Sequence, residues 1–172
     1  MASIKHAVIR TDKMTGTDVD TQLYNVKFYS EDEAAVIDNG NIVMIGDLDP
    51  ENRDVHTVTA PTGEVDMGDL AVTAGVCLFY DESTRHYEDE WENEAERAFR
   101  AYGLHNGCMF SVTAEAFEGT PEVGKYVGYT AGSTKIALAD AASATTFGKI
   151  IDSDIAGRYE YFCIRVSTNA TV

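Results

Sequence analysis

The 172-residue sequence predicts a mainly β protein: a small antiparallel β-barrel or sandwich with an extended N-terminal arm and at most one or two short helices. Two observations lead to this fold class. Short runs rich in β-branched and aromatic residues recur at a spacing of about 8–12 residues, which is typical of a sandwich or barrel. Gly, Asn, Asp and Pro separate these runs, and these residues favour turns.

The N-terminal part differs in charge from the rest. Residues 1–30 carry four basic and three acidic side chains, whereas residues 31–172 carry nine basic and 26 acidic ones. We therefore expect an N-terminal arm and first strand over 1–30 and a β-rich globular domain over 31–172. A division of that domain into two lobes, 31–113 and 114–172, is the alternative. Residues 11–21 are polar and are expected to form a loop or extended arm.

Strands are predicted from alternation and from β-forming residues. Residues 4–9 can pair as a strand, either within this chain or on a partner. Residues 24–29 form the next strand. Residues 34–37 and 42–45 flank the sequence Asp-Asn-Gly-Asn at 38–41. Asn-Gly tolerates positive φ at both central turn positions, so a hairpin with a type I′ turn is expected there.

Proline and glycine punctuate the rest of the sheet. Pro50 and Pro61 end strands, because proline cannot donate to a ladder. Residues 55–60 alternate, and the apolar run 70–80 contains Gly75, which indicates a bulge or bend. The later strands are expected at 108–113, 125–130, 134–138, 147–151 and 159–166.

The segment 81–102 does not follow the β pattern. Its apolar residues recur on one helical face, which predicts an amphipathic helix. These residues are Trp91, Ala95, Ala98, Phe99 and Tyr102. Eight acidic residues stand within 81–96, and like charges four residues apart destabilise a helix. A long acidic loop is therefore the alternative for this segment.

The net charge of −16 bears on partners and location. Nucleic acid and anionic membrane surfaces are not expected as partners, because both require clustered Lys and Arg. No apolar run approaches the roughly 20 residues that span a bilayer. The N-terminus has no apolar signal region, so we expect synthesis in a cytosol without secretion.

No pattern of catalytic or metal-ligating residues stands out. Cys77, Cys108 and Cys163 are far apart and are expected to be buried, reduced thiols. The acidic segment does not match an EF-hand, and no nucleophile or phosphate-binding motif is present. We expect no enzymatic activity, no metal and no cofactor. A hydrolase that uses Asp81, Glu88 or Asp89 is a minor alternative.

Two groups of residues are candidates for binding a partner. An extended arm can add as a strand to an exposed sheet edge and form local ion pairs. The arm residues expected to dock are Ile4, His6, Val8, Arg10 and Lys13. Aromatic side chains are enriched at interfaces. The candidate interface aromatics are Tyr24, Phe28 and Trp91.

Five stretches of hairpin turns and strand ends stand out, at residues 36–46, 53–61, 102–113, 123–127 and 147–151, together about a quarter of the chain. They resemble the capsid decoration proteins of tailed bacteriophages, which are made in the bacterial host cytoplasm, stabilise phage heads and are encoded near the major capsid protein. The resemblance implies a non-enzymatic, mostly β virion protein, often a trimer, with an N-terminal arm laid on the shell. It also implies a loop or extended arm near 86–102.

The resemblance leads to a functional expectation. The chain is expected to bind the major capsid protein on the exterior of the virion, to stabilise contacts between capsid subunits and to self-associate, with a trimer favoured. The alternative is another virion part, such as a head fibre or tail component, or an adhesive β module that binds glycans. That alternative predicts aromatic or carboxylate groups gathered in a shallow groove.

Overall fold

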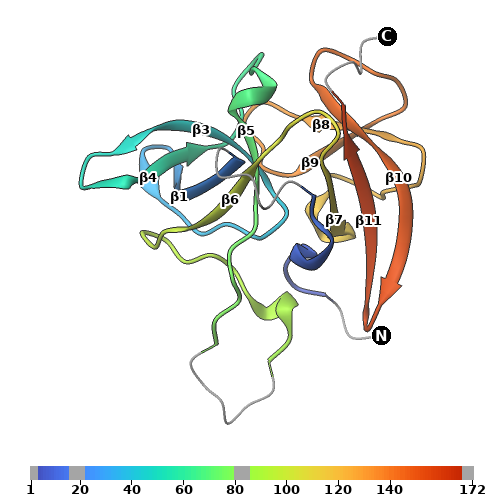
Figure 1. Ribbon diagram of the computed structural model, residues 1–172, viewed down its shortest axis with the longest axis horizontal. Coiled ribbons are helices and arrows are strands. Elements are labelled where there is room, and N and C mark those ends of the chain that lie inside the picture. The colour runs from blue at the N-terminus through green and yellow to red at the C-terminus, as the bar shows by residue number, and fades with distance from the viewer. Residues whose placement is uncertain (1–3, 16–21, 80–85, 168–172) are drawn as a thin grey trace.

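The structure is a computed structural model that describes residues 4–15, 22–79 and 86–167 (Figure 1). Strand accounts for 47% of the residues and helix for 9%, so the predicted mainly β class is confirmed. The strands form two sheets, one from each half of the chain, that lie beside each other in a sandwich-like arrangement. The helical segments in the described part are single 3₁₀ turns, which are η1 (Thr11–Lys13), η3 (Met67–Asp69), η4 (Glu88–Glu90) and η5 (Ala114–Ala116).

The first sheet closes on itself. Its strands are β1 (Leu23–Ser30), β2 (Glu33–Ala34), β3 (Ile42–Asp49), β4 (Asn52–Thr59), β5 (Leu70–Thr73) and β6 (Phe99–Gly103). They follow the order β2-β1-β4-β3-β5-β6, and β6 pairs back with β1, so five strands form a ring. The β1–β4 pairing is parallel, and the other pairings of this sheet are antiparallel.

The second sheet is antiparallel throughout. Its strands are β7 (Met109–Thr113), β8 (Tyr126–Tyr129), β9 (Ile136–Ala139), β10 (Thr146–Ala156) and β11 (Tyr159–Val166). They follow the order β7-β11-β10-β8-β9, which contains two pairs of consecutive strands, β8 with β9 and β10 with β11. The strands predicted over 125–138 and 159–166 are confirmed. β10 is longer than expected, because it continues through residues 152–156, which the sequence places in a connection, to pair with β11.

Alternation within the strands creates two main cores. One small core joins strands of the ring and is formed by Val26, Phe28, Ile37, Val43, Val58, Ala71 and Ala101. The opposite faces of β3 and β5 carry Ile42 and Val72 into a larger core shared with the second sheet. That core includes the fully buried Phe110, Phe147 and Ile164. The burial of Ile42 beside Val43 therefore couples the ring to the second sheet.

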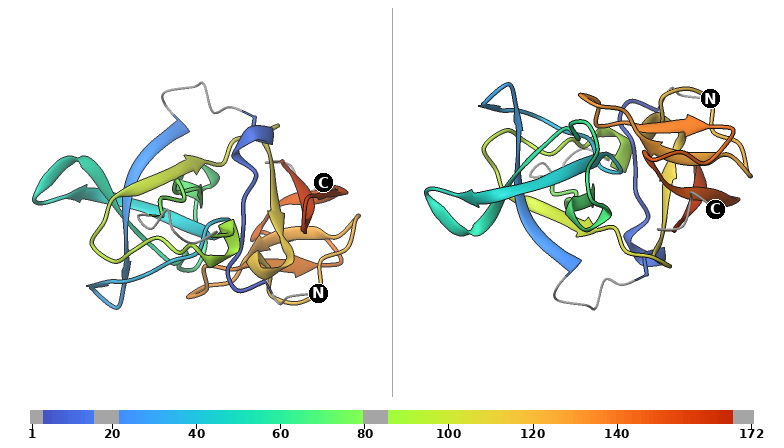
Figure 2. Two further views of the ribbon diagram at one scale, coloured as in Figure 1. Left: turned by 90° about the horizontal axis from the view of Figure 1, so that it is seen from below. Right: turned by 90° about the horizontal axis from the view of Figure 1, so that it is seen from above.

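The N-terminal segment, residues 4–10, runs between the two sheets (Figures 1 and 2). Ala7 and Ile9 are 1% and 7% exposed and belong to the large core. Val8 faces the other way and packs with Tyr159 and Tyr161. Such alternation is typical of a strand buried on both faces. The segment is extended as predicted, and it pairs within its own chain through an antiparallel bridge from Ile9 to β7.

The hairpin predicted around residues 38–41 is wrong. A turn is present, with Gly40 at φ 79°, but the residues on its two sides do not pair with each other. Ile37 forms a bridge with Asn93, and β3 pairs with β4 and β5. The cause is long-range hydrogen bonding by polar side chains. Thr73 Oγ1 donates to the carbonyl of Asp38 and accepts the N–H of Asn41, which holds the turn against β5 instead.

The amphipathic helix predicted over 81–102 is also wrong within the described residues, and residues 80–85 lie outside them. Only the short turn η4 is helical there, and β6 begins at Phe99. Residues 99–102 pair with β1, so tertiary pairing outweighs the local helical periodicity. The acidic-loop alternative describes residues 86–98 correctly. Of the loop predicted over 11–21, residues 11–13 form η1 and residues 16–21 lie outside the described part.

Burial of the N-terminal segment makes a testable prediction for stability. Replacing Ile9 by alanine leaves a cavity between the sheets and should lower the free energy of unfolding by about 2–5 kcal/mol. Urea denaturation followed by tryptophan fluorescence measures this change. Lys13→Ala is the matched control, because Lys13 is exposed and should change stability by no more than about 0.5 kcal/mol. Equal stability of both variants would contradict the buried placement of this segment.

Candidate functional site

A long loop between β5 and β6 leaves the body of the protein and returns to it (Figure 1). We call residues 74–98 the projecting loop, of which 74–79 and 86–98 are described. Its outgoing limb carries two large apolar side chains on the surface, with Val76 57% and Leu78 49% exposed. Its returning limb contains the acidic residues and Trp91. Two exposed apolar side chains close together on one loop are typical of an interaction surface.

The two limbs enclose a hollow of about 210 Å³, which we call the Trp91 hollow. Its apolar lining is Val76, Leu78, Trp91, Ala98 and Phe99. Its polar lining is Asn25, Asn93, Glu94, Arg97 and Arg100. The Trp91 ring packs edge-on against Phe79, with ring centroids 5.5 Å apart. The buried indole N–H of Trp91 has no hydrogen-bond acceptor among the described residues. Such a donor is costly to leave unsatisfied.

A buried polar network holds the base of the projecting loop. Asn39 bonds both backbone groups of Gly75, its Nδ2 donating to the carbonyl at 3.0 Å and its Oδ1 accepting the N–H at 2.7 Å. Asn93 Nδ2 donates to the same Asn39 Oδ1 at 2.9 Å. Gly75 leaves no room for a side chain, since a Cβ there would collide with Asn93. The two limbs are therefore fixed to the turn at residues 38–41.

Asp89 ties the returning limb to the β10–β11 hairpin. Its carboxylate is almost fully buried, accepts the Tyr159 hydroxyl at 2.7 Å and lies 3.6 Å from Arg158 Nη2. Desolvation by burial raises the pKa of Asp89. The hydrogen bonds from Tyr159 and from the backbone N–H of Lys5, together with the Arg158 charge, outweigh this, so the pKa lies below its ordinary value of 3.8. Burial and the Asp89 bond raise the pKa of Tyr159.

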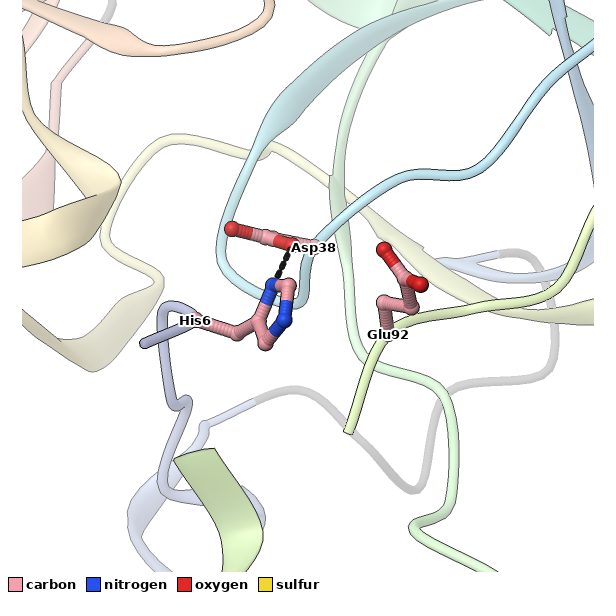
Figure 3. A group of neighbouring side chains, drawn as sticks. All are labelled: His6, Asp38 and Glu92. Carbon is pink, nitrogen blue, oxygen red and sulfur yellow. Dashed lines mark hydrogen bonds and ion pairs between the residues drawn. The ribbon is translucent and has the colours of Figure 1, made fainter. Parts of the chain in front are cut away.

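A cluster of three titratable side chains, His6, Asp38 and Glu92, lies where the N-terminal segment meets the base of the projecting loop (Figure 3). His6 Nδ1 is 2.8 Å from Asp38 Oδ1, and the backbone N–H of Ala7 donates to the other Asp38 oxygen at 3.4 Å. The carboxylate of Glu92 comes from the returning limb. One potential ligand atom from each of His6, Asp38 and Glu92 lies within 4.8 Å of the other two. His6 and Asp38 are half-buried, and Glu92 is exposed.

The predicted arm residues lie in different surroundings and do not form one docking surface. Ile4 packs partly against the Tyr159 cluster, and Val8 is buried within it. His6 turns to Asp38, as described above. Arg10 pairs with Asp12 at 2.7 Å and lies over the Tyr161 ring. Among the five predicted docking residues, only Lys13 is exposed. Val8 therefore stabilises this chain and is not available to add to another sheet.

Of the three predicted interface aromatics, one lies at the site. Phe28 is buried in the ring core, and Tyr24 packs beside that core with its ring edge-on to His56. Trp91 lines the hollow. Asp38, Val76 and Leu78 were not identified as site residues from the sequence. The alternating apolar residues Val76 and Leu78, just before the acidic segment, are the sequence feature that could have indicated an apolar surface there. Nothing in the sequence relates Asp38 to Glu92.

The three cysteines are free thiols but are less buried than expected. Cys77, Cys108 and Cys163 are each half-buried. Burial, with Glu88 nearby, raises the pKa of Cys77 to about 11.

None of the helices in the described part of the chain is long and apolar enough to cross a bilayer. Comparison with protein-family models, with curated proteins and with solved structures finds no match.

The buried Asp89 leads to a prediction about pH. Replacing Asp89 by Asn removes charge-assisted hydrogen bonds and should cost roughly 1.5–3 kcal/mol of stability at pH 7. A carboxyl whose pKa is lowered by folding stabilises the fold above its unfolded pKa, and this stability is lost as the pH falls through the folded pKa. The gap between wild type and Asp89→Asn should therefore narrow below about pH 4.

Urea denaturation at several pH values from 7 to 2.5 measures this effect. Glu88→Gln is the matched control, because Glu88 lies in the same 3₁₀ turn but is exposed. That variant should follow the wild-type curve. A constant gap between wild type and Asp89→Asn at every pH would show that the carboxylate charge does not stabilise the fold.

Proposed function

We propose that this protein is a virion structural protein that binds the outer surface of a phage capsid and stabilises contacts between major capsid subunits. The Trp91 hollow is the observation that supports the proposal and identifies the residues expected to bind the capsid. It combines exposed apolar side chains, an aromatic ring with an unsatisfied N–H, and arginine on a chain of net charge −16. The stretches that resemble capsid decoration proteins support the kind of partner.

The composition of the hollow supports protein binding. The centres of protein–protein interfaces are enriched in Trp and Arg, which contribute most of the binding energy there. Arg97 and Arg100 line the hollow, although the returning limb around them is strongly acidic. An occupant with apolar side chains matches Val76, Leu78 and the Trp91 ring, and acceptor groups on it can bind the two arginines. An extended segment of a capsid subunit, with its main-chain carbonyl groups, has this chemistry.

Docking through the projecting loop replaces docking through the N-terminal arm. Residues 7–9 lie in the cores of this chain, and removing them from those cores would cost stability. Val76 and Leu78 of the projecting loop, in contrast, are exposed, so binding a partner through them requires no loss of core contacts. Self-association into a trimer remains part of the proposal. Three linked loops on one shell would raise the apparent affinity above that of one loop.

A second candidate function is glycan binding by an adhesive β module. The observation that favours it is the grouping of Trp91 with Asn25, Asn93 and Glu94 in one shallow hollow. Amide and carboxylate groups can hydrogen-bond sugar hydroxyls, and an aromatic ring can pack on a sugar face. Capsid decoration is preferred, because Val76 and Leu78 make a large part of the lining apolar and exposed.

Co-sedimentation with empty capsids tests the proposed function. The capsids are assembled from the major capsid protein of the phage that carries this chain, and bound protein is quantified across a concentration series. Val76→Asp places a charge in the apolar surface and should weaken binding at least about 10-fold, equivalent to about 1.4 kcal/mol. Trp91→Ala should weaken binding by a similar factor or more, as for interface residues of this type.

Val123→Asp is the matched control, since Val123 is 54% exposed and does not line the hollow. It should bind as wild type, and melting temperatures confirm that all three variants are folded. Unchanged capsid binding by both hollow variants would contradict docking through this loop. Binding on a glycan array that Trp91→Ala abolishes, with no capsid binding by wild type, would favour the second candidate.

A further inference from the structure

We infer that His6, Asp38 and Glu92 form a binding site for a divalent transition-metal cation of the zinc class. The three side chains come from the N-terminal segment, from the turn before β3 and from the returning limb of the projecting loop (Figure 3). One ligand atom from each lies within 4.8 Å of the other two. This inference is separate from capsid binding, because none of the three residues lines the Trp91 hollow.

The backbone brings the two carboxylates together. Ile37 and Asn93 form an antiparallel bridge, with N–H···O distances of 3.2 and 2.9 Å in the two directions. Asp38 and Glu92 are the next residues on the two strands, so they occupy facing positions. Like charges at facing positions destabilise a pair of strands. A cation between Asp38 and Glu92 converts this repulsion into attraction.

His6 is held in place independently of Glu92. Its backbone N–H donates to the carbonyl of Asp89 at 3.1 Å, and its Nδ1 meets Asp38 at 2.8 Å. Asp38 is fixed in turn by the N–H of Ala7. A metal ion that binds both His6 and Asp38 replaces the proton shared in this hydrogen bond, because ligands of a metal must be deprotonated. The imidazole and the first carboxylate are therefore preorganised, which reduces the entropy lost when a metal binds.

Charge and donor type identify the cation class. Among the residues that the structure describes, no lysine or arginine forms an ion pair with Asp38, and the carboxylate of Glu92 has no hydrogen-bond or ion-pair partner. Two carboxylates and a neutral imidazole sum to −2, which a divalent cation neutralises. Zinc accepts nitrogen and carboxylate ligands together, whereas calcium and magnesium prefer oxygen alone.

Zinc binding requires the Glu92 side chain to move closer to the other two ligands. Zinc–ligand bonds of about 2.0–2.2 Å bring ligand atoms closer together than the upper separation seen here. The Glu92 side chain is exposed and unpartnered within the described residues, so it can rotate toward His6 at little cost. Water completes the coordination on the exposed side. Binding then links the N-terminal segment to the projecting loop through the metal.

Isothermal titration calorimetry of the full chain with Zn²⁺ tests the inference. Wild type should bind one Zn²⁺ at a saturable site. Glu92→Gln and His6→Ala should each weaken that binding at least about 10-fold, the lower limit expected for loss of a residue at a metal site. The matched control is Glu94→Gln, two residues along the same limb, which should bind as wild type. Ca²⁺ should bind this site more weakly than Zn²⁺.

Substitution by Co²⁺ gives a second readout. Its visible absorption should show nitrogen and oxygen ligation without thiolate charge-transfer bands, because no cysteine of the described residues belongs to this group of ligand atoms. Equal Zn²⁺ binding by wild type and Glu92→Gln would overturn the inference and assign the ion to the acidic surface. Absence of a saturable Zn²⁺ site in wild type would overturn the inference as well. His6 and Asp38 would then form only a hydrogen-bonded pair within the fold. Neither outcome depends on capsid binding.

Discussion

Burial of residues 7–9 between the two sheets is the constraint on which the rest of the structure depends. The ring and the second sheet share one large core, and Ala7 and Ile9 occupy part of it. Val8, facing the other way, completes the cluster with Tyr159 and Tyr161. The backbone of the same segment bonds to Ser111 and Thr113 of β7 and to Asp89 of the projecting loop. One short extended segment therefore orients both sheets and the loop relative to each other.

The loop base is specified by polar groups, whereas the sheets are joined by apolar ones. Asn39, Asn93 and the backbone of Gly75 bond to each other in a buried space that leaves no room for a residue larger than glycine at position 75. Buried polar networks of this kind require all their members, because each partner left alone is costly. The base is therefore rigid where the limbs leave the body. A rigid base under an apolar surface lowers the entropy that docking loses.

Local signals in the sequence were sufficient for some parts of the fold and not for others. β8 pairs with β9, and β10 pairs with β11, so these two pairings join strands that are consecutive in the sequence. The turn at 38–41 was recognised from Asn-Gly, but its flanks separate because Thr73, distant in sequence, binds it. The helix predicted over 81–102 had the right periodicity, yet Phe99 and the residues after it pair with β1. Propensity is a weak prior where tertiary contacts compete.

The same distinction explains what the sequence revealed of the two sites. Trp91 and His6 were identified by residue type alone, whereas Asp38 and Glu92 meet only because Ile37 bridges Asn93 across more than fifty residues of chain. Trp91 and Glu92 are adjacent, so on the extended returning limb their side chains point to opposite sides. One faces the Trp91 hollow and the other faces His6. Docking and cation binding therefore use opposite sides of one limb. Occupancy of the cation site would stiffen the limb that carries Trp91 without entering the docking surface.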